Sequence, residues 1–280
     1  MQHADTLPQA PYVVAGPCSA ESPEQVLRCA EELVRGGSIQ LFRALAAAEI
    51  WVFLRQPVMI ALTLLLPAGL LAITALAETS FRPQAWAQIA GRDLVAVQCI
   101  TVYFVALNTL TARRHTLALK RLRTTALPSV GIVAGLLVPP LLVGVFQVVV
   151  VFTGLVVLGA PLPQSPLLIG VSVLLGMIIA TLAGVVTSGL TATPEKAQWT
   201  MMPFFVAVMG AISVLPSVDP SIINALLAVP LTANGHLVTT GWHVGTANTN
   251  EVMVDVAFMV VWAVILSLVS WKTFRWERRH

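Results

Sequence analysis

The chain has 280 residues, of which 57% are hydrophobic and 10% are charged, and it carries a net charge of +3 at pH 7. Soluble globular domains contain about 25% charged residues. The composition therefore excludes an ordinary soluble domain, because a fold of this length could not bury so much apolar surface. The three cysteines, Cys18, Cys29 and Cys99, match no zinc-binding spacing, and we expect no disulfide framework.

Residues 1–37 are polar and lack the apolar core of a secretory signal peptide. Within them, YVVAGPCSAESPEQVLRCAEELVRGG resembles the first strand, loop and helix of 3-deoxy-heptulosonate phosphate synthases, whose metal-binding cysteine matches Cys18. A (β/α)8 barrel needs about 250 residues of alternating strands and helices, whereas this chain continues into apolar runs. We expect a cytoplasmic tail with one helix near 23–35. A membrane-anchored synthase, a wrongly assigned start and a borrowed fragment are the alternatives.

Residues 38–56 predict an amphipathic helix that lies on the inner membrane surface. Apolar side chains recur there at helical spacing, at Ile39, Phe42, Ala46, Ile50 and Phe53. Trp51 suits the level of the lipid headgroups. The alternative is a cytoplasmic extension of the first membrane span.

Six apolar runs follow, and a span requires about 20 such residues. They cover about 57–77, 94–112, 129–158, 166–190, 199–216 and 252–271. Pro139 and Pro140 interrupt the long third run and predict a kinked or strongly tilted helix. We predict an all-α membrane protein with a six-helix transmembrane domain over 57–271 and a basic cytoplasmic tail over 272–280.

The distribution of Lys and Arg predicts the orientation, because short cytoplasmic loops are rich in both. With six spans, 14 of the 16 Lys and Arg residues lie on the same side of the membrane as the termini, and only Arg82 and Arg92 lie on the opposite side. We therefore expect a multi-pass protein of the cytoplasmic (inner) membrane with both termini in the cytoplasm.

Signatures of catalysis and of ion coupling are missing from the sequence. The spans have no Lys, Arg, Glu or His near their middle, which weakens the case for an ion-coupled carrier. The motifs HExxH and GxSxG are absent, and the lack of any Gly-Lys pair excludes a phosphate-binding loop GxxxxGK[ST]. His236, His243, Glu251 and Asp255 match no ligand spacing, so we interpret the histidines as solvated loop residues. We expect no catalytic site, metal or cofactor in this chain, and no nucleic-acid partner.

Polar residues within the spans favour hydrogen bonds between helices over contact with a substrate. They are Gln98, Asn108, Gln147, Thr153, Ser172 and Thr181. Methionine and phenylalanine in spans four and five suit an adaptable apolar surface, with ordinary helix packing as the alternative. The candidate substrate path comprises Gln98, Asn108, Met201, Met202, Phe205 and Met209.

The segment 113–128, RRHTLALKRLRTTALP, interleaves basic residues with leucines. Such a helix can rest on an anionic leaflet or dock into a groove on a soluble partner; simple retention of topology is the alternative. Residues 38–280 resemble the permease subunits of ABC-2 type exporters, which share the interfacial helix, six spans, internal termini and a basic coupling helix inserted into the ATPase subunit. The family often has Glu where this chain has His115. The resemblance implies that the ATPase-coupling residues are Arg113, Arg114, His115, Leu117, Lys120, Arg121, Leu122 and Arg123.

Residues 223–242 resemble the external half-helices of the same family around a Pro-Leu-Thr motif, here Pro230, Leu231 and Thr232. Their apolar run is too short to span a bilayer, so we expect a short re-entrant pair. The resemblance implies a homodimer or heterodimer of permeases with two copies of a separate ATPase that binds ATP and Mg. It implies export of a drug-like or antibiotic-like amphipathic molecule or of a lipid-linked substrate. The alternative is a non-transporting membrane scaffold that recruits a soluble partner.

Overall fold

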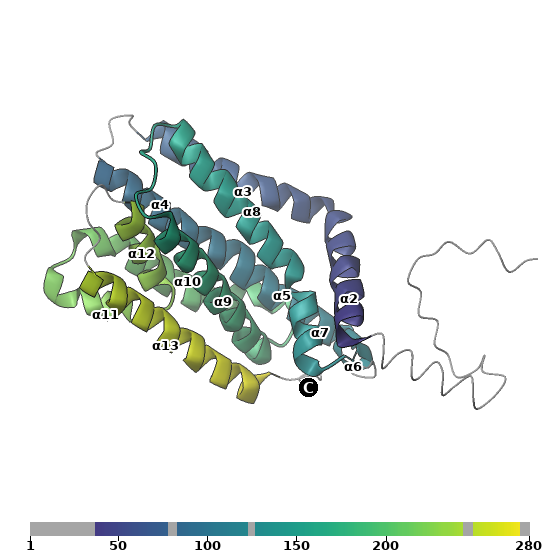
Figure 1. The fold of residues 1–280 in the computed structure, drawn as a ribbon. Coiled ribbons are helices and arrows are strands. Elements are labelled where there is room, and N and C mark those ends of the chain that lie inside the picture. The colour runs from purple at the N-terminus through teal and green to yellow at the C-terminus, as the bar shows by residue number, and fades with distance from the viewer. Residues whose placement is uncertain (1–36, 78–82, 123–126, 243–248, 275–280) are drawn as a thin grey trace, which may run out of the picture.

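The computed structural model describes residues 37–77, 83–122, 127–242 and 249–274, and the regular elements among them are all helical. Figure 1 shows long helices running side by side, with α6 and α7 at one end of the bundle and α11 at the other. The α-helices are α2 (Gly37–Leu54), α3 (Pro57–Leu76), α4 (Pro83–Val97), α5 (Phe104–His115), α6 (Ala118–Leu122), α7 (Ser129–Leu136), α8 (Val138–Val157), α9 (Pro166–Leu190), α10 (Ala197–Val214), α11 (Ile223–Leu227), α12 (Thr232–Trp242) and α13 (Thr249–Thr273). A π-helical segment, Gln98–Tyr103, joins α4 to α5.

Five helical stretches of the described residues are long and apolar enough to cross a membrane. They are Gln84–His115, Val138–Val157, Pro166–Leu190, Pro194–Ser217 and Thr249–Thr273. The all-helical class is thereby confirmed, and the composition of these helices is that of a multi-pass membrane protein. In α3, Thr63–Leu76 form a shorter apolar helix, so a sixth span there stays a prediction.

The second expected span, 94–112, is too short, because the helix runs without a break from Gln84 to His115. Arg92 and Asp93 interrupt the apolar pattern of the sequence at this point. In the structure Asp93 is fully buried, and the guanidinium of Arg92 lies 3.5 Å from its carboxylate. The helix therefore carries this charged pair inside its first half.

The third apolar run is divided, as Pro139 and Pro140 predict. α7 ends at Leu136, and α8 begins at Val138. Both prolines lie in the first turn of α8, where a backbone N–H has no partner within the helix. The lack of an N–H on proline therefore costs the helix no hydrogen bond. The predicted interruption is confirmed.

Helix α2 runs across one end of the bundle at a steep angle to α3 (Figure 1). Its predicted apolar face is turned inward at Phe42, Ala46, Ile50 and Phe53, which are half-buried or buried. Ile39 differs from the expectation, since 71% of it is exposed. The inward face packs against α7, α8 and α3, which is the arrangement required of a helix lying along the edge of the bundle.

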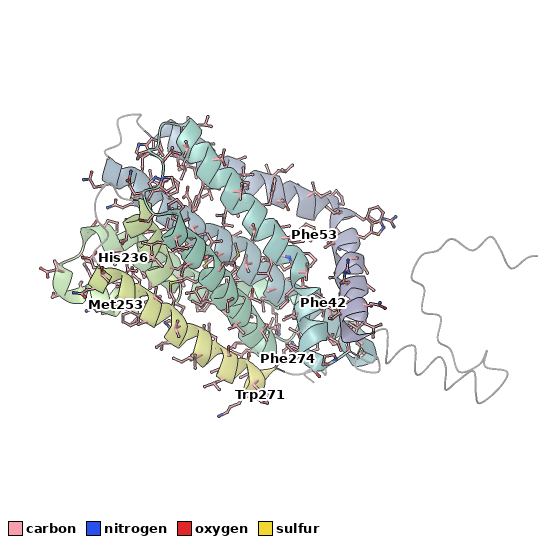
Figure 2. The ribbon with its side chains drawn as sticks, viewed as in Figure 1. Phe42, Phe53, His236, Met253, Trp271 and Phe274 are labelled. Atoms are coloured by element: carbon pink, nitrogen blue, oxygen red, sulfur yellow. The ribbon has the colours of Figure 1, made fainter. Side chains whose placement is uncertain are left out.

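The described residues form two hydrophobic cores. The larger surrounds the helix from Gln84 to His115, whose most apolar window is 72% buried, whereas that of α13 is only 17% buried and lies at the periphery. The smaller core joins α2, α5, α6 and α7, and Phe42 and Phe274 pack against it. Figure 2 shows Phe42 and Phe274 at this end of the bundle and His236 and Met253 at the opposite end.

Candidate functional site

Two arginines of the basic segment are held by the protein itself. The Nη2 atom of Arg113 donates to both carboxylate oxygens of Glu49, at 2.7 and 2.5 Å, and so joins α5 to α2. Arg114 is buried and donates to the backbone carbonyl of Thr191, the residue that caps the C terminus of α9. A cation at this position also meets the negative end of the helix dipole. The end of α5 is therefore fixed to two other helices.

A strained turn follows the fixed arginines. α5 ends at His115, and Leu117 adopts the left-handed conformation, with φ 60°. This conformation costs a non-glycine residue about 1–2 kcal/mol. The side chain of Leu117 is nevertheless 42% exposed. The turn thus presents an apolar side chain at the surface, beside the smaller core.

Helix α6 is anchored to the smaller core through Leu119, which is fully buried. The other buried members of that core are Ala106, Leu110, Leu127, Ile132, Leu136, Leu137 and Val185. Leu122 packs against them from α6 as well, and His115 is half-buried. The side chains of Lys120 and Arg121 and all of Arg123 lie outside the described residues. Any displacement of α6 must therefore move side chains of α5 and α7 that share this core.

Three buried polar side chains form a network between the π-helical segment, α9 and α12. The hydroxyl of Ser172 donates to the backbone carbonyl of Asn234 at 2.8 Å and also contacts its side-chain oxygen. The amide of Asn234 donates in turn to Gln98, whose own amide lies 3.5 Å from the carbonyl of Val173. Gln98 is fully buried, so its observed role is to bind helices of this chain to one another.

A second polar contact links α3, α8 and the π-helical segment. Thr101 donates to Gln147 at 2.5 Å, and the amide of Gln147 donates to the carbonyl of Thr63 at 3.0 Å. Mid-span Gln98, Gln147 and Ser172 all make hydrogen bonds between helices, which agrees with the interpretation favoured from the sequence.

The six candidate path residues do not share one surface. Gln98 and Met201 are buried in the larger core, and Met202 is 44% exposed. The remaining three are half-buried: Asn108, Phe205 and Met209. Within this chain the structure therefore separates the set into core and surface positions.

The Pro-Leu-Thr motif forms the turn between α11 and α12. Leu231 has φ 65° and is 2% exposed, while Thr232 is fully buried and begins α12. α12 then packs on α4 so closely that a Cβ on Gly91 would lie under 3.0 Å from the carbonyl of Gly235. At its far end, the indole of Trp242 donates to Pro161 at 2.9 Å. α12 is a short helix surrounded by protein.

The loop before α11 begins with a side-chain cap. The backbone N–H of Ser221 donates to the carboxylate of Asp219 at 2.9 Å. This hydrogen bond stabilises the ionised form and lowers the pKa of Asp219.

The sequence suggested that His236 is a solvated loop residue, but the structure places it in a helix. It lies on α12, is 22% exposed and pairs through Nδ1 with the carboxylate of Asp255 at 2.8 Å. Asp255 is fully buried on α13, so the pair ties the two helices together. Among the described residues no three His, Cys, Asp or Glu side chains come together as a metal site. His243 lies outside the described residues.

No family model, curated protein or solved structure matches this chain. The sequence did not single out Asn234 or Glu49, because each acts through a partner distant in the chain. It brought His236 and Asp255 together only as possible metal ligands and did not predict their ion pair.

Proposed function

We propose that this chain is the membrane permease subunit of an ATP-driven exporter of the ABC-2 type, coupled to a separate ATPase through α6. The observation that supports this most is the construction of the basic segment. Arg113 and Arg114 fix the end of α5, Leu119 anchors α6 in the smaller core, and Leu117 stays exposed in a strained turn. Strain of this kind is characteristic of functional contacts.

The proposed mechanism follows from this anchoring. A soluble ATPase that binds α6 and Leu117 would displace α6. The side chains of α6 share the smaller core with side chains of α2, α5 and α7. Packed cores respond to such a push by switching between discrete arrangements rather than by deforming continuously. The motion would reach a path between two permease copies, through which an amphipathic small molecule or a lipid-linked substrate leaves the cell. The ATPase, in two copies, would supply the binding site for ATP and Mg.

The proposed orientation places α2, α6 and both termini in the cytoplasm and the turn before α12 outside. The Pro230–Thr232 turn and the enclosed α12 fit a re-entrant external pair. Labelling single-cysteine variants in intact cells with a membrane-impermeant maleimide tests this orientation. Leu162→Cys, in the exposed loop between α8 and α9, should react, and Leu117→Cys should be protected. The reverse pattern would exclude the proposal.

The coupling role is tested by a substitution at the exposed turn. Leu117→Asp should reduce both co-purification of an ATPase and substrate-stimulated ATP hydrolysis, while membrane insertion and thermal stability are retained. Leu162→Asp is the matched control, because it places the same charge on another exposed leucine at the opposite end of the bundle. An unchanged yield of ATPase with the Leu117 variant would argue against coupling through this turn.

A membrane scaffold is the second candidate, since an exposed leucine beside basic residues can recruit any soluble partner. The two proposals differ in the partner. A co-purified protein with a phosphate-binding loop, whose hydrolysis responds to candidate substrates, supports the exporter. A partner without that loop supports the scaffold.

A further inference from the structure

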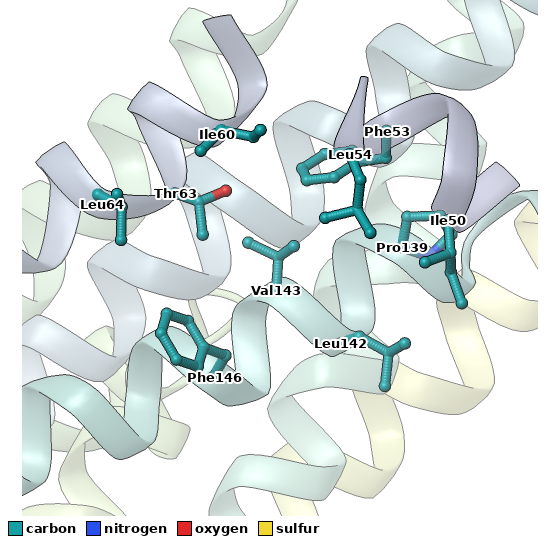
Figure 3. A pocket seen from close by; sticks show the side chains of 10 residues that line it. All are labelled: Ile50, Phe53, Leu54, Ile60, Thr63, Leu64, Pro139, Leu142, Val143 and Phe146. Atoms are coloured by element: carbon teal, nitrogen blue, oxygen red, sulfur yellow. The ribbon is translucent and has the colours of Figure 1, made fainter. Parts of the chain in front are cut away.

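An apolar cavity of about 310 Å³ lies where α2 meets α3 and α8. Figure 3 shows side chains from all three helices around it. They include Ile50 and Leu54 of α2, Ile60 and Leu64 of α3, and Leu142 and Phe146 of α8. Thr63 is the one polar residue among those that line it. A water molecule needs two or more polar partners, so this cavity favours hydrocarbon over water.

The rim of the cavity continues onto the outer surface of the bundle. Leu64 is 55% exposed, Leu142 53% and Phe146 48%. In a membrane these faces of α3 and α8 contact acyl chains. A chain lying along them can enter the cavity without crossing any polar surface.

A positive charge lies next to this apolar rim. Arg55 directly follows Leu54, and its guanidinium carbon lies 4.9 Å from the ring centroid of Trp51. Both side chains are exposed at the bend between α2 and α3. No acidic side chain among the described residues forms an ion pair with Arg55. Stacking on an indole orients the guanidinium while leaving its donors available to an anion.

We propose that this bend binds an anionic phospholipid, with its phosphate at Arg55 and one acyl chain in the cavity between α3 and α8. The charge selects the headgroup, and the apolar lining selects the chain. A soluble phosphate ester would leave the cavity empty. A zwitterionic lipid such as phosphatidylcholine would be attracted less strongly to the guanidinium, because its own quaternary ammonium offsets the charge of its phosphate. The inference rests on the membrane location of the bundle but not on the exporter role, so failure of ATPase coupling leaves it unaffected.

Native mass spectrometry of the full-length protein, titrated with phosphatidylglycerol or phosphatidylcholine, tests the headgroup. The wild type should bind phosphatidylglycerol more tightly. Arg55→Gln should weaken phosphatidylglycerol binding about fivefold and phosphatidylcholine binding by less, because the removed basic residue contacts a net anionic headgroup only in the first lipid. Lys272→Gln is the matched control: it removes another exposed positive charge, near the C terminus of α13, and should change neither affinity.

A substitution that fills the cavity tests whether an acyl chain binds there. Val143, half-buried, lines the cavity on α8, whereas Val149, further along the same helix, is 58% exposed and does not line it. Val143→Phe should reduce binding of both lipids, and Val149→Phe should reduce neither. Unchanged phosphatidylglycerol binding by the Arg55 variant would overturn the proposal. So would a polypeptide found to occupy the cavity in place of lipid.

Discussion

Gly176 lies on α9 against the polar network, where an added methyl group has no space. A Cβ there would lie under 3.0 Å from the side-chain amides of Asn234 and Gln98. The amide of Asn234 donates to Gln98, and its side-chain oxygen accepts from Ser172, so neither amide can retreat without losing a buried hydrogen bond. We expect Gly176→Ala to lower the free energy of unfolding by about 1–3 kcal/mol through overpacking. A lost hydrogen bond would add about 1 kcal/mol.

Gly170 is the control on the same helix, because it is exposed and a Cβ there would have no neighbour within 4 Å. Gly170→Ala should stabilise the protein by up to about 1 kcal/mol through helix propensity. Thermal unfolding of the purified protein in detergent measures both changes. At about 2–4 °C per kcal/mol, the Tm of Gly176→Ala should fall by roughly 2–12 °C, whereas that of Gly170→Ala should stay equal or rise. Equal shifts of the two variants would refute the packing described for the network.

Three further predictions concern pairs and turns outside the network. A double-mutant cycle of Glu49→Gln and Arg113→Gln, measured by chemical denaturation, should give a coupling energy of about 1 kcal/mol, because the pair is only partly buried; zero coupling would remove the link between α2 and α5. His236→Ala should destabilise the protein by about 3–5 kcal/mol by leaving the buried Asp255 without its partner. Adding Asp255→Asn should then restore part of the loss in the same thermal assay, and a double variant less stable than the single one would contradict the pairing. Leu117→Gly should raise the free energy of unfolding by up to about 1 kcal/mol by relieving the left-handed strain, and a loss of stability would show that the turn is not strained.

The positions of most long helices could be predicted from the sequence. The run 166–190 coincides with α9, and the pair Pro139 and Pro140 places the break in the third run. Hydrophobic length is a local property, so it can be read from consecutive residues. The start of the helix that contains the second expected span, in α4, could not be predicted this way. A charged residue such as Asp93 ends an apolar window even when the fold buries it.

The candidate sites depend on contacts between distant residues, which a single sequence does not contain. Asn234 and Gln98 are 136 positions apart, and Glu49 and Arg113 are 64 apart. A basic run in the sequence likewise does not reveal which of its members face inward. The structure shows that Arg114 is buried against Thr191, so part of this charge serves to hold the helices together.

Crosslinking from position 117 in living cells tests the central proposal most directly. A photoreactive residue in place of Leu117 lies in the exposed turn beside α6 and contacts whatever binds there. The exporter proposal predicts a covalent adduct with a soluble polypeptide that contains a GxxxxGK[ST] loop and hydrolyses ATP. Adducts formed with extracellular material, or only with proteins that lack this loop, would contradict it.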